Sequence, residues 1–240
     1  MTDRLYLDDP YLVRFEADVL AERRLGDRPA VVLSRTAFYP EGGGQPADHG
    51  ALGGARVVDV QEVEGEILHA LEGAPPRGRV AAEIDWPRRF DHMQQHHGQH
   101  LLSAAFEQGL GARTVSFHLG AETCTIDLDL SPDRLRPAAL AGVERAANDL
   151  VWRDLPVTVA ERSPEELARL QLRKEPTKGS RVVTVGDGID HSPCGGTHPR
   201  RTGEVGAIAV LGAERWGGGA RVEFACGGRV PALLRRDAAR

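Results

Sequence analysis

Residues Asp91–Gln108 read DHMQQHHGQHLLSAAFEQ and divide the chain into two parts with different secondary-structure patterns. Apart from Gly98, this stretch has no glycine or proline, and it is rich in Gln, Leu and Ala, which favour a helix. Asp91 is a suitable N-cap residue and Gly109 a suitable end. The sequence therefore predicts a helix here and a domain boundary near residue 90.

The part before this helix has the pattern of β-structure. Short apolar runs are separated by Gly- and Pro-containing segments at 41–46, 53–54 and 73–78, which is typical of a small barrel or sandwich. The runs are Val19-Leu20, Ala30–Leu33, Ala55–Val60, Ile67–Leu71 and Val80–Ile84.

The part after the helix mixes helices and strands without regular βαβ alternation, so its expected class is α+β. We expect a hairpin around Gly120, a helix from Ser131 to about Arg153, a short helix over 164–173, and further strands. The expected strands are 157–160, 181–185, 206–211 and 221–225.

Composition limits the function classes. The chain has 240 residues, 30 basic and 35 acidic side chains, and a net charge of -5, which argues against a generic nucleic-acid binder. The charge is uneven, however: residues 1–150 hold 15 basic and 24 acidic side chains, and residues 151–240 hold 15 and 11, a net of +4. Three scattered cysteines, no apolar N-terminal segment and no membrane-length apolar run predict a cytoplasmic protein that does not contact membranes.

Two histidines in the predicted helix, His96 and His100, are one turn apart and share a face, so both imidazoles can reach one metal ion. His92 lies one turn earlier on the same stripe, and spacing alone does not separate the pair His92/His96 from His96/His100. The roles of His97 and His191 stay open.

A second group of metal-ligand residues lies in Pro193-Cys194-Gly195-Gly196-Thr197-His198. The two glycines allow a tight loop, so Cys194 and His198 can chelate one ion. Three imidazoles and a thiolate suit Zn²⁺ better than Mg²⁺ or Ca²⁺. Four protein ligands are typical of a closed structural site, whereas a catalytic site keeps an open position, so the coordination number also stays open.

Four motifs in this order resemble the alanyl-tRNA editing proteins of the AlaX family, freestanding relatives of the alanyl-tRNA synthetase editing domain. They are Thr36–Gln45 (TAFYPEGGGQ), the HxxxH helix followed by LLSAAF, the CGGTH loop followed by RTGEVG, and Arg221–Gly227 (RVEFACG). The resemblance runs from about residue 10 to residue 229. Only eleven residues follow Arg229, so the chain is similar to the medium-length class of the family, which lacks the C-terminal domain of longer members.

The resemblance implies an α+β protein with an N-terminal β-barrel domain, 1–90, and a zinc-binding editing domain, 91–240, of the threonyl- and alanyl-tRNA synthetase type. It implies Zn²⁺ held by His96, His100, Cys194 and His198. It also implies hydrolysis of the ester that joins a wrong amino acid, chiefly serine, to alanine tRNA, and whether Gly-tRNA(Ala) is a further substrate stays open.

The resemblance also supplies candidate binding residues. Thr36 matches a position that helps recognise serine, and Gly42, Gly43 and Gly44 match a loop near the pocket. Ser116 and His118 are candidate pocket residues where the synthetases place a Gln, and His97 replaces a frequent Thr. Basic residues of the positive segment are candidates for tRNA binding: Arg173, Lys174, Lys178, Arg181, Arg200, Arg201, Arg215 and Arg221.

The function expected from these residues is a monomeric, zinc-dependent aminoacyl-tRNA deacylase. Two alternatives stay open, a zinc module that binds RNA without catalysis and a zinc hydrolase of another ester or amide. The HExxH signature of zinc peptidases is missing, because His97 follows His96.

Overall fold

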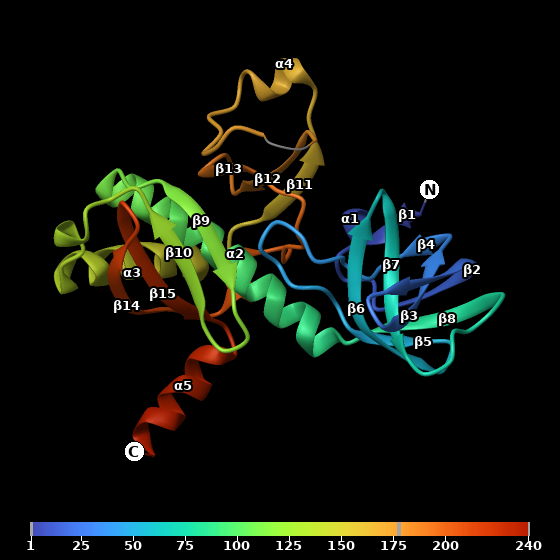
Figure 1. Cartoon of the computed structure of the whole chain (residues 1–240). Coiled ribbons are helices and arrows are strands. Elements are labelled where there is room, and N and C mark those ends of the chain that lie inside the picture. The colour runs from blue at the N-terminus through green and yellow to red at the C-terminus, as the bar shows by residue number, and fades with distance from the viewer. Residues whose placement is uncertain (1, 177–178, 240) are drawn as a thin grey trace. The chain divides into compact units, whose positions relative to one another are not determined.

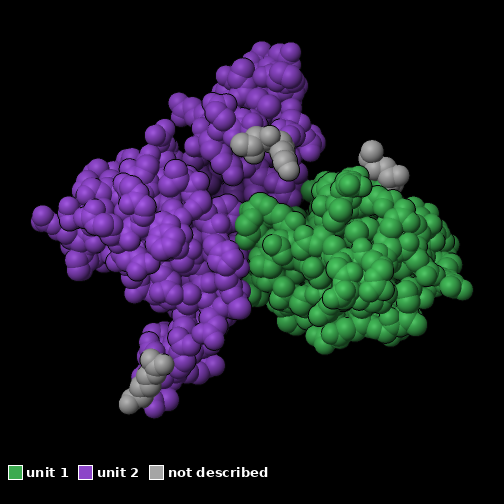
Figure 2. Space-filling model, in the orientation of Figure 1, with its two compact units in different colours: residues 1–92 green, residues 93–240 purple. Residues whose placement is uncertain are grey.

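A computed structural model describes residues 2–176 and 179–239. The chain forms two compact units, Met1–His92 and Met93–Arg240 (Figures 1 and 2). No helix within the described residues combines the length and the hydrophobicity needed to span a bilayer.

The first unit is a closed antiparallel barrel with the strand order β2-β3-β7-β6-β5-β8. Closure pairs the edge strands with each other, and alternate side chains fill the interior with residues such as Val31, Val57 and Leu71. The predicted N-terminal barrel is therefore confirmed. Its strands are β2 (Arg14–Leu25), β3 (Arg28–Leu33), β5 (Gly50–Leu52), β6 (Ala55–Val63), β7 (Glu66–Glu72) and β8 (Arg79–Ile84).

Two short elements and one long connection complete this unit. The strand β1 (Asp3–Arg4) pairs in parallel with β4 (Arg35–Thr36), and the single-turn helix α1 (Leu5–Asp8) lies between them in sequence. The connection from β4 to β5 carries the Gly42–Gly44 motif.

The long helix α2 (Trp86–Leu110) begins five residues before the predicted start. The carboxylate of Asp85 accepts a hydrogen bond of 3.3 Å from the backbone N–H of Arg88, so Asp85 caps the helix and the predicted cap at Asp91 is wrong. Proline suits the first turn, which is why Pro87 does not delay the helix. At the other end, Gly111 adopts φ +65°, which makes it rather than Gly109 the helix-ending glycine.

The main sheet of the second unit has the order β14-β15-β10-β9. One face packs against α2, where Leu102 and Phe106 share a core with Ile126, Val222 and Phe224. The strands are β9 (Thr114–Leu119), β10 (Cys124–Leu128), β14 (Ile208–Trp216) and β15 (Gly219–Cys226).

A second sheet of three strands, β11-β12-β13, leads into the CGGTH loop. The strands β11 (Val157–Glu161) and β12 (Arg181–Val185) agree with the predicted ones, whereas β13 (Asp190–Pro193) was not predicted. Because β13 ends at Pro193, it delivers Cys194 directly into the loop.

The remaining helices differ from the prediction. Pro137 holds Arg136 in an extended conformation, so the predicted helix from Ser131 is split into a short 3-10 turn and α3. The predicted helix over 164–173 is only one turn long. The elements are η1 (Pro132–Arg134), α3 (Pro137–Trp152), α4 (Pro164–Leu167), η2 (Thr202–Val205) and α5 (Arg229–Ala238), of which η2 and α5 were not predicted.

Candidate metal centre

The four side chains predicted as metal ligands meet in the second unit. His96 and His100 project from successive turns of α2, and Cys194 and His198 from the loop after β13. One potential ligand atom from each residue lies within 4.8 Å of the other three. Cys194 Sγ is 3.3 Å from both His96 Nε2 and His198 Nε2.

These separations fit a tetrahedral metal ion. Bond lengths of about 2.0–2.3 Å in a tetrahedron place neighbouring ligand atoms roughly 3.3–3.6 Å apart. His100 Nδ1 is buried without a hydrogen-bond partner among the described residues, so this ring has a nitrogen that no described protein group uses. The cluster therefore could hold a metal ion.

The ligand loop is held by a buried arginine. Arg181 on β12 is 9% exposed and donates from Nη1 to the carbonyl oxygens of Cys194 (2.8 Å) and Gly196 (2.9 Å). The backbone N–H of Gly196 lies 3.4 Å from Cys194 Sγ and favours the thiolate. Arg181, a predicted tRNA-binding residue, thus shapes the ligand loop in the structure.

Burial keeps the imidazoles neutral. It lowers the pKa of His96 to about 3, with smaller contributions from Lys174 and Arg181. It also holds the pKa values of His100 and His198 well below the usual range. Neutral imidazoles have the lone pair that a metal ion requires.

The same burial raises the pKa of the Cys194 thiol, although the Gly196 N–H and nearby Lys174 and Arg181 oppose the shift. A metal ion must therefore displace the thiol proton when it binds.

The strand β9 turns Phe117, rather than its two neighbours, toward the cluster. The ring centroids of Phe117 and His96 are 5.5 Å apart. Since side chains alternate along a strand, Ser116 and His118 lie on the opposite face, where both are exposed. Ser116 donates to Asp127 at 2.5 Å. The structure does not bring these two predicted pocket residues to the cluster, and the sequence reasoning missed Phe117.

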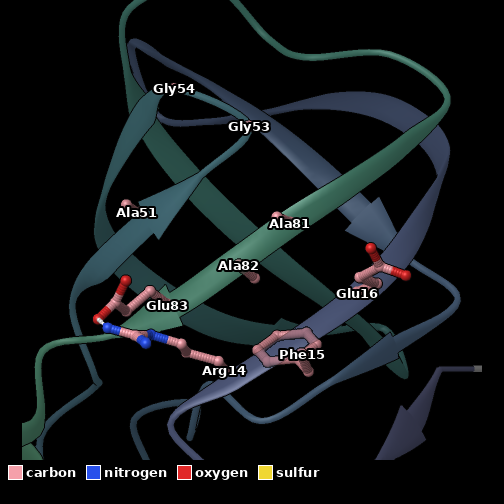
Figure 3. Close-up of a pocket in the computed structure, with 9 residues that line it drawn as sticks. All are labelled: Arg14, Phe15, Glu16, Ala51, Gly53, Gly54, Ala81, Ala82 and Glu83. Atoms are coloured by element: carbon pink, nitrogen blue, oxygen red, sulfur yellow. Dashed lines mark hydrogen bonds and ion pairs between the residues drawn. The ribbon is translucent and has the colours of Figure 1, made fainter.

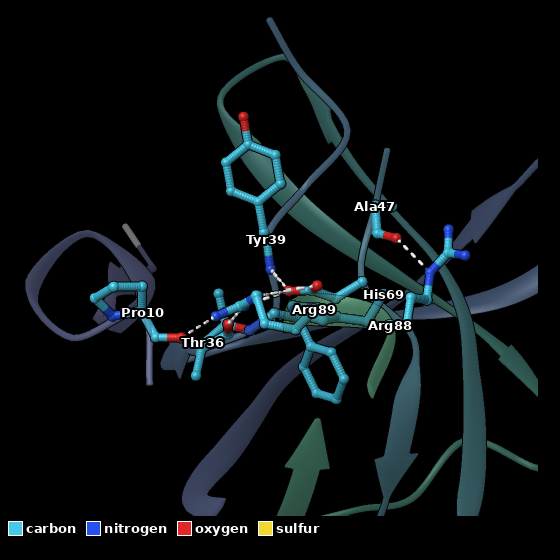
Figure 4. A network of polar contacts seen from close by, with 10 residues as sticks. Pro10, Thr36, Tyr39, Ala47, His69, Arg88 and Arg89 are labelled. Atoms are coloured by element: carbon cyan, nitrogen blue, oxygen red, sulfur yellow. Dashed lines mark hydrogen bonds and ion pairs between the residues drawn. The ribbon is translucent and has the colours of Figure 1, made fainter. Parts of the chain in front are cut away.

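Thr36 lies in the first unit, fully buried, with its hydroxyl 2.8 Å from His69 Nε2 (Figure 4). His69 Nδ1 is 3.1 Å from the carbonyl oxygen of Val31, which can only accept a hydrogen bond. Burial lowers the pKa of His69 to about 4, so its single proton is on Nδ1 and Nε2 accepts the Thr36 proton. The Thr36 oxygen also accepts from the backbone N–H of Phe38 at 3.1 Å.

The glycine motif forms a tight turn in the same unit. Gly42 and Gln45 exchange backbone hydrogen bonds of 3.1 and 3.0 Å. Gly43 and Gly44 have φ values of +55° and +81°, which explains why glycine is used at both positions. The turn is braced by Tyr39, whose hydroxyl donates to the Gly42 carbonyl at 2.9 Å.

The predicted tRNA-binding residues fall into distinct groups. Lys174, Arg200 and Arg215 are exposed, and Lys178 lies outside the described residues. Three others pair with carboxylates: Arg173 with Asp190 (2.9 Å), Arg201 with Asp154 (2.6 Å) and Arg221 with Asp127 (2.7 Å).

A groove of about 480 Å³ lies on the barrel wall and is shown in Figure 3. Its lining includes an ion pair of 3.0 Å between Arg14 and Glu83, and otherwise mainly alanine and glycine. It contains no histidine or cysteine, so it offers none of the chemistry of the metal cluster.

Fold and site together define an editing domain of the tRNA synthetase type. Residues 180–223 match the threonyl and alanyl tRNA synthetase second additional domain, and residues 12–88 match the class II (A) tRNA synthetases. The first match contains Cys194 and His198, half of the metal cluster.

Whole-chain comparison is more specific. The chain is 40% identical over 250 residues to the alanyl-tRNA editing protein AlaX-L of Pyrococcus horikoshii, covering 96% of this chain and 59% of the relative. It is 36% identical over 191 residues to the alanyl-tRNA editing protein Aarsd1 of Danio rerio, covering 77% and 46%. The alanine–tRNA ligase of Pyrobaculum calidifontis is 40% identical over 230 residues, covering 89% and 25%.

The chain belongs to the alanyl-tRNA editing protein family, which is related to the editing domain of alanine–tRNA ligases. It spans less than two thirds of the length of these relatives.

Proposed function

We propose that this protein is a trans-editing deacylase that hydrolyses the ester of mischarged alanine tRNA, with Ser-tRNA(Ala) as its main substrate. The observation that carries the proposal is the convergence of His96, His100, Cys194 and His198 in a chain of this family.

The metal in this proposal is Zn²⁺, because a thiolate and three imidazoles form a donor set that it prefers. When bound, zinc supplies a Lewis acid that polarises a carbonyl group or lowers the pKa of a water molecule. The protein positions the four donors, and Phe117 provides an apolar wall beside His96 that limits the access of bulk water.

In this proposal, Thr36 is the residue that selects serine over alanine. Its proton is committed to His69, so Thr36 can offer a substrate only an acceptor. A serine hydroxyl can donate to this oxygen, whereas alanine has nothing to donate. A site that pairs a substrate hydroxyl rejects the analogue without it, because the polar group of the site is then left unpaired.

The tRNA is held, in this proposal, by exposed basic residues of the second unit, among them Lys174, Arg200 and Arg215. Phosphate contacts of this kind supply affinity without base specificity.

A zinc module that binds RNA without catalysis is the second candidate, because four protein ligands are typical of a closed site. It differs from the first candidate in one result, since it predicts tRNA binding without ester hydrolysis.

The test uses one alanine tRNA charged with serine, glycine or alanine. We expect the protein to release serine fastest, to lose this activity on zinc chelation and to regain it when zinc is restored. Binding without hydrolysis would favour the RNA-binding module, and neither binding nor hydrolysis would reject both candidates.

A Thr36→Val variant tests the basis of selection and should narrow the difference between the rates on Ser-tRNA and Ala-tRNA. Thr2→Val is a matched control, because Thr2 is another buried threonine of this unit and donates to the carbonyl of Leu33 at 2.7 Å. An unchanged rate ratio in Thr36→Val would remove Thr36 from this role.

A further inference from the structure

His97 lies on α2 between His96 and His100, and it is not itself a member of the metal cluster. Its side chain is fully buried. Its ring lies edge-on to that of His198, with a centroid distance of 5.3 Å, and its Nδ1 is 3.2 Å from His198 Nδ1. Two imidazole nitrogens at this distance form a hydrogen bond only if one carries the proton and the other a lone pair.

The metal cluster decides which nitrogen is the donor. His198 turns Nε2 toward Cys194 Sγ, at 3.3 Å, so Nε2 is the atom that faces the other ligands. An imidazole that ligates through Nε2 has its proton on Nδ1. His198 Nδ1 therefore donates, and His97 Nδ1 accepts.

The opposite arrangement is incompatible with ligation. If His97 Nδ1 donated to His198, the proton of His198 would have to be on Nε2, and His198 would leave the ligand set. A hydrogen-bond acceptor beside His198 Nδ1 thus selects the tautomer that binds metal, as carboxylates and carbonyls do beside other metal-ligating histidines.

We propose that His97 is a positioning residue that fixes the tautomer and ring orientation of His198 by accepting its Nδ1–H. This inference rests on the metal-binding part of the proposed function. It also has a consequence for His97 itself, whose own proton must then be on Nε2. That atom is buried and has no protein partner among the described residues, so it is a hydrogen-bond donor available to a water or a substrate oxygen.

The test compares two substitutions at this position. His97→Leu removes the acceptor, whereas His97→Asn keeps one, because the amide Oδ1 is bonded to Cγ just as the histidine Nδ1 is. Zinc affinity is measured by competition with a chromophoric chelator. We expect His97→Leu to bind zinc about 10- to 100-fold more weakly. We expect His97→Asn to remain within about threefold of the unsubstituted protein, as a neutral acceptor is retained.

The matched control is His118→Asn, which changes an exposed histidine of the same unit and should leave zinc affinity unchanged. A His97→Leu variant that binds zinc as tightly as the unsubstituted protein overturns the proposal, and so does a His97→Asn variant as weak as His97→Leu. If His97→Leu fails to fold in a thermal melt, the His97→Asn affinity and the tautomer spectrum decide.

Long-range ¹H–¹⁵N correlation spectra of the zinc-loaded protein report the tautomer directly. We expect His198 to carry its proton on Nδ1, and a proton on Nε2 overturns the assignment. An unsubstituted protein that binds no zinc at all rejects the metal centre itself, which distinguishes that failure from a failure of the role of His97.

Discussion

Arg89 is the largest fully buried side chain of the protein among the described residues, and its loss should destabilise the barrel unit more than any surface change. Its Nε lies 3.0 Å from the carboxylate of Asp48, which is also fully buried. Its Nη1 and Nη2 donate to the carbonyls of Pro10 (2.7 Å) and Ala37 (2.5 Å) (Figure 4). Asp48 in turn accepts from the backbone N–H of Tyr39 at 2.6 Å.

These contacts fasten the segment from Thr36 to Asp48, which carries the glycine motif, to the first turn of α2. Arg89→Met would leave the Asp48 charge buried without its partner and deprive two carbonyls of their donor. Removing one partner of a buried ion pair lowers the free energy of unfolding by about 3–5 kcal/mol. For a unit of this size each 1 kcal/mol lowers the melting temperature by about 4–8 °C, so the expected shift is about 12–40 °C.

The assay needs a signal from the first unit alone. Trp86 is the single tryptophan among residues 1–92, and its ring lies 5.4 Å from Phe90. In a background with Trp152→Phe and Trp216→Phe, the fluorescence of Trp86 therefore follows the melting of this unit.

Arg88→Met is the matched control. Arg88 is the adjacent residue and is only partly buried, and its side chain makes a single hydrogen bond among the described residues, of 3.0 Å to the Ala47 carbonyl. The substitution Arg88→Met should lower the free energy of unfolding by about 0.5–1.5 kcal/mol. Adding Asp48→Asn to Arg89→Met should recover part of the loss, because no unpaired charge then remains buried. An Arg89→Met protein that melts within about 4 °C of its parent would refute the reasoning.

Two further predictions concern the second unit. Gly98→Ala should lower the free energy of unfolding by about 1–3 kcal/mol, measured in a thermal melt, because the new Cβ would lie 2.3 Å from Cys226 Sγ. Gly142→Ala in α3 is the control and should be neutral or stabilising, because the space around Gly142 is open. Equal effects of the two substitutions would contradict the packing argument. Burial raises the pKa of the Cys194 thiol and lowers that of His96 to about 3, so zinc should displace one thiol proton. The apparent zinc affinity should then rise about tenfold per pH unit between about pH 6 and pH 8, and chelator competition that shows no pH dependence would contradict this.

Each half of the candidate metal cluster could be predicted because its spacing is local. His96 and His100 are placed by the helical period, and Cys194 and His198 by a short glycine loop. The choice of His100 rather than His92 needed the structure or the family resemblance, since both lie one turn from His96. The role of His97 could not be predicted, because its partner His198 is 101 residues away in sequence.

The pocket residues on β9 show a different limit. The hairpin around Gly120 was predicted, and this prediction is confirmed by β9 and β10. The prediction did not extend to the face that each side chain occupies, although Leu119 provided a signal. Leu119 is an apolar residue expected in the core, and alternation places Phe117 on its face and Ser116 and His118 on the other.

The positive charge of residues 151–240 is less available to a tRNA than its sum suggests. Arg181 is buried and serves the ligand loop, and Arg173 is paired with Asp190 and Ser192 on the strand that leads into this loop. Arg181 therefore contacts the backbone of Cys194 itself, and Arg173 contacts the strand before it. The sequence reveals the charge of an arginine but not its partner. In a segment with a net charge of +4, several arginines can therefore form hydrogen bonds and ion pairs within the protein itself. In the proposed function, the exposed cations Lys174, Arg200 and Arg215 therefore carry more of the phosphate contact than the charge count alone implies.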